Sequence, residues 1–100
     1  MATPQVVEST VATAHVPTSW GVGTWEDSIV LTIPGFVRGV IDCDGPGNLL
    51  VAFSEDGVTG SDARTIRNGE SLSIDKMRLH TIKIDATTNA TAYRVLLQGV

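Results

Sequence analysis

Apolar and polar residues alternate along most of this chain, from about residue 26 to its end. In "EDSIVLTI" the apolar side chains fall at Ile29, Leu31 and Ile33, and the same spacing of two recurs in later stretches. A period of two places successive side chains on opposite faces of a strand. The pattern therefore predicts antiparallel strands with one face in the core and the other in water.

Turn residues separate the alternating stretches. Pro34 and Gly35 predict the end of one strand, "DGPGN" and Asn68–Gly69 predict turns, and a short strand is expected at about 64–66. The last two strands, joined through "ATTNA", are expected to form a hairpin, with Thr81, Lys83 and Asp85 on its outer face. The expected inward residues are Val37, Ile41, Cys43, Leu49, Val51, Phe53, Leu72, Ile74, His80, Ile82, Ile84, Tyr93, Val95 and Leu97.

No stretch has a helical period, so the fold class that we predict is all-β. The expected architecture is an antiparallel β-sandwich or jelly-roll-like barrel of about seven to eight short strands, with an extended N-terminal arm. Val30, Val40, Leu50 and Leu96 fall on the outer faces of these strands. Apolar residues gathered on such a face would mark a contact surface.

The chain changes in composition at about residue 25. Residues 1–25 contain one charged residue, Glu8, and the remaining 75 residues contain seventeen. Valine and threonine are frequent in this segment, which favours extended backbone rather than a disordered tail. Residues 5–16 could form an ordinary strand of the chain's own sheet, or an arm that lies across another subunit. We divide the chain into an arm with a tryptophan-containing loop, 1–25, and a sandwich domain, 26–100.

Length and charge exclude several classes of function. One hundred residues suit a single domain. The net charge is −4 and the basic residues are scattered among acids, which argues against a nucleic-acid surface. Cys43 is the only cysteine, so we expect no internal disulfide and a thiol that packs as a small apolar group. Neither a secretory signal nor a membrane span is expected.

Candidate chemistry is sparse, and we predict a protein that is not an enzyme and holds no cofactor or metal. Asp42, Asp44 and Asn48 lie in one tight turn, where a cation site is the alternative to a structural turn. A calcium-binding loop would carry glutamate where Phe53 stands. His15 and His80 are far apart in the sequence, and we interpret both as strand histidines with satisfied hydrogen bonds.

Two tryptophans in "PTSWGVGTWED" are the candidate anchors of the N-terminal segment. Trp20 and Trp25 lie five residues apart among glycines and small polar residues. They could close one end of the sandwich, contact a partner subunit, or stack on a sugar ring. The sequence leaves these three alternatives open.

The C-terminal third, "IRNGESLSIDKMRLHTIKIDATTNATAYRVLLQGV", resembles small virion structural proteins of tailed bacteriophages. The resemblance rests on a Gly turn and on the strands "ESLSI", "MRLHTIKI" and "TAYRVLLQ". It implies a β-sandwich that decorates or cements a capsid, or builds a neck or tail, as an oligomer with extended arms. The expected location is the virion, assembled in the host cytoplasm.

We therefore predict a virion structural protein that acts through protein–protein contacts. Its expected partners are further copies of itself, with a trimer as one candidate, and a major capsid or other virion protein, with no nucleic acid and no membrane. The alternative is a carbohydrate-binding or adhesin module, with a glycan as partner. The predicted interface residues are Val6, Val7, Val11, Val16, Trp20 and Trp25.

Overall fold

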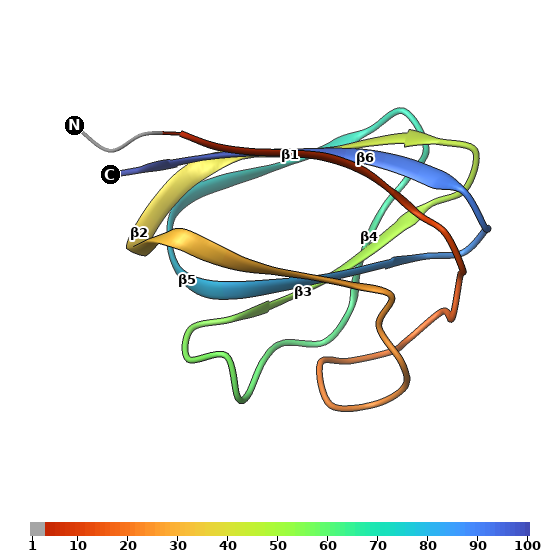
Figure 1. Cartoon of the computed structure of the whole chain (residues 1–100), viewed down its shortest axis with the longest axis horizontal. Coiled ribbons are helices and arrows are strands. Elements are labelled where there is room, and N and C mark those ends of the chain that lie inside the picture. Colours follow the sequence, from red (N-terminus) through yellow and green to blue (C-terminus); the bar gives the residue numbers. More distant parts are fainter. Residues whose placement is uncertain (1–3) are drawn as a thin grey trace.

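A computed structural model describes residues 4–100 and confirms the all-β fold class (Figure 1). The strands are β1 (Gln5–Val11), β2 (Asp27–Gly45), β3 (Leu49–Ser54), β4 (Arg64–Ile66), β5 (Ser71–Ala86) and β6 (Thr91–Gly99). All pair antiparallel in one sheet, in the order β1-β6-β2-β5-β3-β4. Within these residues no helix is long and apolar enough to cross a membrane.

Two long strands fold this sheet into two facing layers. β2 and β5 pair along their length and bend together, at the left of Figure 1. The first layer contains β1, β6, residues 37–45 of β2 and residues 71–77 of β5. The second layer contains residues 27–33 of β2, residues 79–86 of β5, β3 and β4.

The predicted strand end at Pro34 and Gly35 is wrong, because the backbone bends there and continues as β2. The pairing of β2 with β5 shifts in register between Val30 and Gly35. Gly35 has φ of 106°, a left-handed conformation that only glycine adopts without strain. The turn residues therefore mark a corner inside one strand, not the gap between two strands.

A second irregularity bends β5. Arg38 of β2 lies opposite both Asp75 and Lys76, so β5 carries one extra residue at this point. Such a bulge increases the local bend and twist of a strand, and Lys76 has φ of 51°. Arg38 Nε donates to Asp75 Oδ1 at 3.0 Å across the bulge. The two predicted strands "ESLSID" and "LHTIKID" are consequently one strand.

The predicted hairpin between the last two strands is also wrong. β6 pairs with β1 and β2, and β5 pairs with β2 and β3. Both edges of residues 81–84 of β5 are already occupied by β2 and β3, so β6 cannot pair with them. Residues 87–90 instead cross from the second layer to the first.

The core fills the space between the two layers. The inward positions predicted from alternation are buried, except that Leu72 is only partly buried and His80 is exposed. Leu79 takes the inward position next to the bend of β5, where alternation is interrupted. Cys43 is buried as expected, and its thiol lies 3.3 Å from the carbonyl oxygen of Gly47.

Side chains join the two layers where the sheet remains open. Gln5 Nε2 donates to the Val30 carbonyl at 3.3 Å, and Gln5 Oε1 accepts from Thr32 N at 3.0 Å. Tyr93 donates its hydroxyl proton to Asp27 Oδ2 at 2.8 Å, and burial together with this bond raises the pKa of Tyr93 above its ordinary value. Gln5 of β1 and Tyr93 of β6 thereby tie the first layer to the first half of β2 through side chains.

Candidate functional site

The structure divides the six predicted interface residues between surface and interior. β1 pairs with β6 of its own chain, so residues 5–11 form an edge strand of the chain's own sheet. Residues 1–3 of the predicted arm lie outside the described residues. Val6 and Val16 are exposed, Val7 and Trp25 are partly buried, and Val11 and Trp20 are buried.

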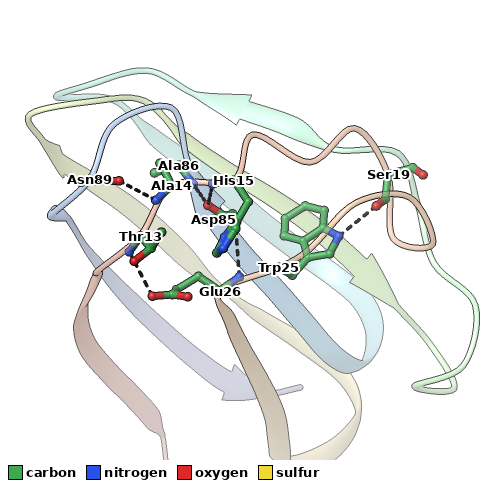
Figure 2. A network of polar contacts seen from close by, with 9 residues as sticks. All are labelled: Thr13, Ala14, His15, Ser19, Trp25, Glu26, Asp85, Ala86 and Asn89. Atoms are coloured by element: carbon green, nitrogen blue, oxygen red, sulfur yellow. Dashed lines mark hydrogen bonds and ion pairs between the residues drawn. The ribbon is translucent and has the colours of Figure 1, made fainter.

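Residues 12–26, which we call the strap, run over the outer face of the second layer. The strap lacks a regular strand and is held by the side chain of Asp85 in β5 (Figure 2). Asp85 Oδ1 accepts from His15 N, and Asp85 Oδ2 accepts from Glu26 N, each at 2.9 Å. His15 Nδ1 lies 2.9 Å from Asp85 Oδ2. One carboxylate therefore fixes both ends of the strap.

Asp85 is the residue that the sequence pattern places on the wet face, yet its side chain is completely buried. The alternation correctly places Asp85 on the outer face of the second layer. The strap covers this face, so Asp85 is buried. A buried carboxylate is stable only when hydrogen bonds replace its water, and Asp85 also accepts from the N–H of Ala86 at 2.7 Å. His15 lies on the strap and not on a strand, which corrects the interpretation from sequence.

Further hydrogen bonds connect the strap to its surroundings. Thr13 N donates to Glu26 Oε2 at 3.0 Å, and Ala14 N donates to Asn89 Oδ1 at 2.8 Å. Figure 2 shows both bonds to the left of Asp85. The strap is consequently bonded to itself and to the turn between β5 and β6.

Both tryptophans take part in the packing of the strap. Trp20 is 7% exposed, and its indole N–H donates to the Val58 carbonyl at 3.0 Å. Lys83 Nζ lies 4.2 Å from the centroid of the Trp20 ring, a cation–π distance. Trp25 donates its indole N–H to the Ser19 carbonyl at 2.9 Å. Trp20 therefore closes the outer face of the second layer.

A short polar loop, residues 54–62, supports the other side of Trp20. Asp56 Oδ1 accepts from Val58 N at 2.8 Å and from Thr59 N at 2.9 Å, and the Ser54 hydroxyl lies 3.0 Å from the same oxygen. These donors hold the pKa of Asp56 well below its ordinary value, with the two backbone N–H groups as the main cause. The ionised carboxylate thus sets the shape of the loop.

We expect Asp56→Asn to destabilise the fold at neutral pH and less so in acid. A lowered pKa stabilises the folded state above the unfolded value of about 3.9, and this contribution is lost as the pH falls toward the folded value. The difference in unfolding free energy between the wild type and the variant should therefore shrink below about pH 4. Urea unfolding at a series of pH values measures this difference. A difference that does not change with pH would contradict the lowered pKa of Asp56.

The acidic turn, for which a cation site was one alternative, is occupied by protein contacts. Arg94 donates from Nε and Nη2 to the two carboxylate oxygens of Asp44, at 2.9 and 3.1 Å. These bonds raise the pKa of Arg94 above its ordinary value. Asp42 accepts from the Ser71 hydroxyl and lies 3.6 Å from Arg94 Nη2. Within residues 4–100 no three acidic, histidine or cysteine side chains converge as a metal site would require.

The outer face of the first layer carries a row of apolar side chains, the exposed Val6 and Leu96 and the partly buried Val40, which we call the apolar row. Val6 pairs with Leu96, and Leu96 pairs with Val40, so the three lie side by side across β1, β6 and β2. Val6 is 60% exposed and Leu96 is 46% exposed. The strap covers the corresponding face of the second layer, where Leu50 and Ala52 are buried outside the main core.

Charged residues border the apolar row. Glu8 pairs with Arg94, and Arg94 pairs with Asp42, in the row next along the same face. On the other side Arg38 pairs with Gln98. The face is therefore an apolar strip between polar margins, which is the composition of many protein contact surfaces.

Two adjoining clefts lie at the end of the second layer, between β3, the 54–62 loop and the bend of β5. One cleft has a volume of about 300 Å³ and is lined mainly by polar residues of the loop. The other, of about 220 Å³, includes the apolar side chains of Phe53, Met77 and Leu79 and the side chains of Arg64 and Arg78. Phe53, Glu55 and Ser61 line both clefts, so the two are neighbours.

Comparisons of the chain with models of protein families, with curated proteins and with solved structures found no match.

Proposed function

We propose that this chain is a non-enzymatic assembly protein, a structural component of a virion that acts by packing against other protein subunits. The proposed partners are further copies of the chain and a capsid, neck or tail protein. The apolar row is the observation that carries the proposal, because Val6, Leu96 and Val40 are adjacent, directed outward and uncovered by the strap.

The size of the apolar row determines what kind of contact it can support. Burying one valine or leucine completely contributes about 1.5 to 3 kcal/mol, and these side chains are already about half buried. Three of them would contribute about 3 kcal/mol, whereas association costs at least about 4 kcal/mol. One such contact is weak alone, so the proposed contact includes surrounding residues and is repeated by symmetry.

The positions of the tryptophans favour protein contacts over sugar binding. A sugar ring stacks on an accessible aromatic face, whereas Trp20 is 7% exposed and its ring packs against Lys83 of the second layer. Trp25 is partly buried, and its indole N–H is bonded within the strap. Neither ring is presented as the flat exposed platform that a glycan module needs.

We expect Leu96→Ser to lower self-association without unfolding the chain, because Leu96 is the central residue of the apolar row and is half exposed. The mass of wild type and variant should be followed by light scattering over a range of concentrations. Val30→Ser is the matched control, since Val30 is 59% exposed on a strand of the second layer. The proposal would be contradicted if Leu96→Ser left the measured mass unchanged. It would also be contradicted if Val30→Ser lowered the mass as much as Leu96→Ser does.

Point substitutions are a sharper test than removal of the N-terminal segment. Deleting residues 1–18 would remove β1, the buried Val11 and the contact of His15 with Asp85. The shortened chain would be expected to unfold, and its mass would not report on an interface. The virion location is tested separately, by quantifying the chain in purified particles.

A further inference from the structure

The cleft beside the bend of β5 has the composition of a site that receives an apolar side chain next to an acidic one. Phe53, Met77 and Leu79 supply its apolar part, and Arg64 and Arg78 lie among the residues that line it. Arg38 and Arg94 are ion-paired elsewhere on the chain. Within residues 4–100, Arg64 and Arg78 form neither an ion pair nor a side-chain hydrogen bond. Their guanidinium groups are thus free to meet a carboxylate of a partner.

The cleft is formed in advance, because hydrogen bonds fix the loop on its rim. Ser61 Oγ accepts from Phe53 N at 3.0 Å, and Ser61 N donates to the Phe53 carbonyl at 2.9 Å. The bonds of Asp56 to residues 58 and 59 fix the remainder of the loop. A preformed site loses little conformational entropy when it is filled, which favours binding.

The complementary surface is present on the same chain. One side of the apolar row is bordered by three carboxylates, Glu8, Asp42 and Asp44, and by one guanidinium, Arg94, so this margin is net negative. On the other side Arg38 is ion-paired with Asp75. Asp44 and Asp42 are held by Arg94, whereas Glu8 has no ion-pair partner within 4 Å among residues 4–100. The cleft that contains Arg64 and Arg78 has one carboxylate in its own lining, Glu55, so this lining is net positive, whereas Asp56 lines only the adjoining cleft. Charge and apolar surface therefore match between the two sites.

We infer that the cleft of one copy receives the apolar row of a second copy, with Leu96 as the inserted side chain and Glu8 facing Arg64 and Arg78. The inference rests on the proposed function, because it assigns the partner of the apolar row. The two surfaces are different parts of the molecule, so the contact is head-to-tail. Head-to-tail contacts close into rings when the rotation allows and otherwise extend as filaments.

Charge reversal tests the pairing. Arg78→Glu and Glu8→Arg should each weaken self-association about five- to tenfold, because each places like charges across the contact. The double variant, Arg78→Glu with Glu8→Arg, should associate more tightly than either single variant, since positions 8 and 78 then carry opposite charges again, although position 8 and Arg64 carry like charges. Arg67→Glu, a surface change of the same charge away from the cleft, should leave the association unchanged. Sedimentation equilibrium at fixed salt measures all five proteins.

The outcomes separate this inference from the function on which it rests. If Leu96→Ser abolishes self-association and Arg78→Glu does not, the apolar row is an interface and the cleft is not its partner. If both single reversals weaken association and the double variant associates no more tightly than either, the pairing of Glu8 with the cleft is overturned. If the wild-type chain stays monomeric at every concentration, both the inference and self-assembly through the apolar row are overturned.

Discussion

Asp85→Ala is expected to lower the free energy of unfolding by about 3 to 5 kcal/mol at neutral pH. The substitution removes the acceptor of the backbone N–H groups of His15 and Glu26 and of the imidazole of His15. Each buried donor that loses its acceptor costs about 1 to 3 kcal/mol, less where water can reach it. The loss is large beside the 5 to 15 kcal/mol by which small domains are stable.

The matched control is Asp75→Ala. Asp75 also accepts a hydrogen bond from a basic side chain, Arg38, but its side chain is 76% exposed. An exposed ion pair of this kind contributes at most about 1 kcal/mol. Urea unfolding should therefore separate the two alanine variants by at least about 2 kcal/mol. Equal effects would mean that Asp85 does not hold the strap in solution, and near-ultraviolet circular dichroism would then show Trp20 and Trp25 unchanged.

Gly39→Ala is expected to destabilise the chain by about 3 kcal/mol or more, although it adds a single methyl group. A Cβ at residue 39 would lie 1.9 Å from the carbonyl oxygen of Leu96 and 2.9 Å from its carbonyl carbon. Both atoms belong to the backbone of β6, which no side-chain rotation can move aside. β2 and β6 would have to separate in the middle of the first layer, where Gly39 pairs with Leu97.

Gly21→Ala provides the control for this substitution. A Cβ at residue 21 would meet no atom within 4 Å, and Gly21 has no positive φ. Its effect should stay within about 0.5 kcal/mol. Thermal unfolding followed by far-ultraviolet circular dichroism compares the two alanine variants with the wild type. If Gly39→Ala unfolds at the wild-type temperature, the close approach of β2 and β6 is wrong.

The sequence predicted the fold class and most of the core, because alternation is a local property that the sheet preserves. The sequence pattern and the structure agree on two sets of residues that share the core face of a strand. These sets are Ile29, Leu31 and Ile33, and Tyr93, Val95 and Leu97. The sequence could not predict which strands pair, since pairing depends on edges that other strands have already occupied. The hairpin expected at the end of the chain is wrong for this reason.

The sequence also could not distinguish a corner from a strand end. Pro34 and Gly35 are turn residues in either case, and the difference lies in whether β5 bends at the matching point. Gly35 pairs with Leu79, and the bulge of β5 lies further along, at Lys76 opposite Arg38. Lys76 gave no signal in the sequence, because lysine rarely takes a positive φ.

The candidate site shows the same limit. Val40 and Leu96 could be placed on outer faces from alternation, but only the register brings them together with Val6. Asp85 looked like an ordinary wet-face residue because its burial comes from the strap, a segment about seventy residues earlier. The low charge of residues 1–25 was the one signal in the sequence that this segment packs against other protein surface.

The pairing of β1 with β6 has a consequence for how the chain is made. Residues 5–11 pair with residues 91–97, so the partners are 80 to 92 positions apart in the sequence. The ribosome releases the first strand long before its partner emerges, and pairing over such distances is slow. During synthesis β1, which is rich in valine and has one charged residue, is therefore unpaired and exposed to other nascent chains. Damage to the last strand would leave it permanently without its partner and prone to aggregate.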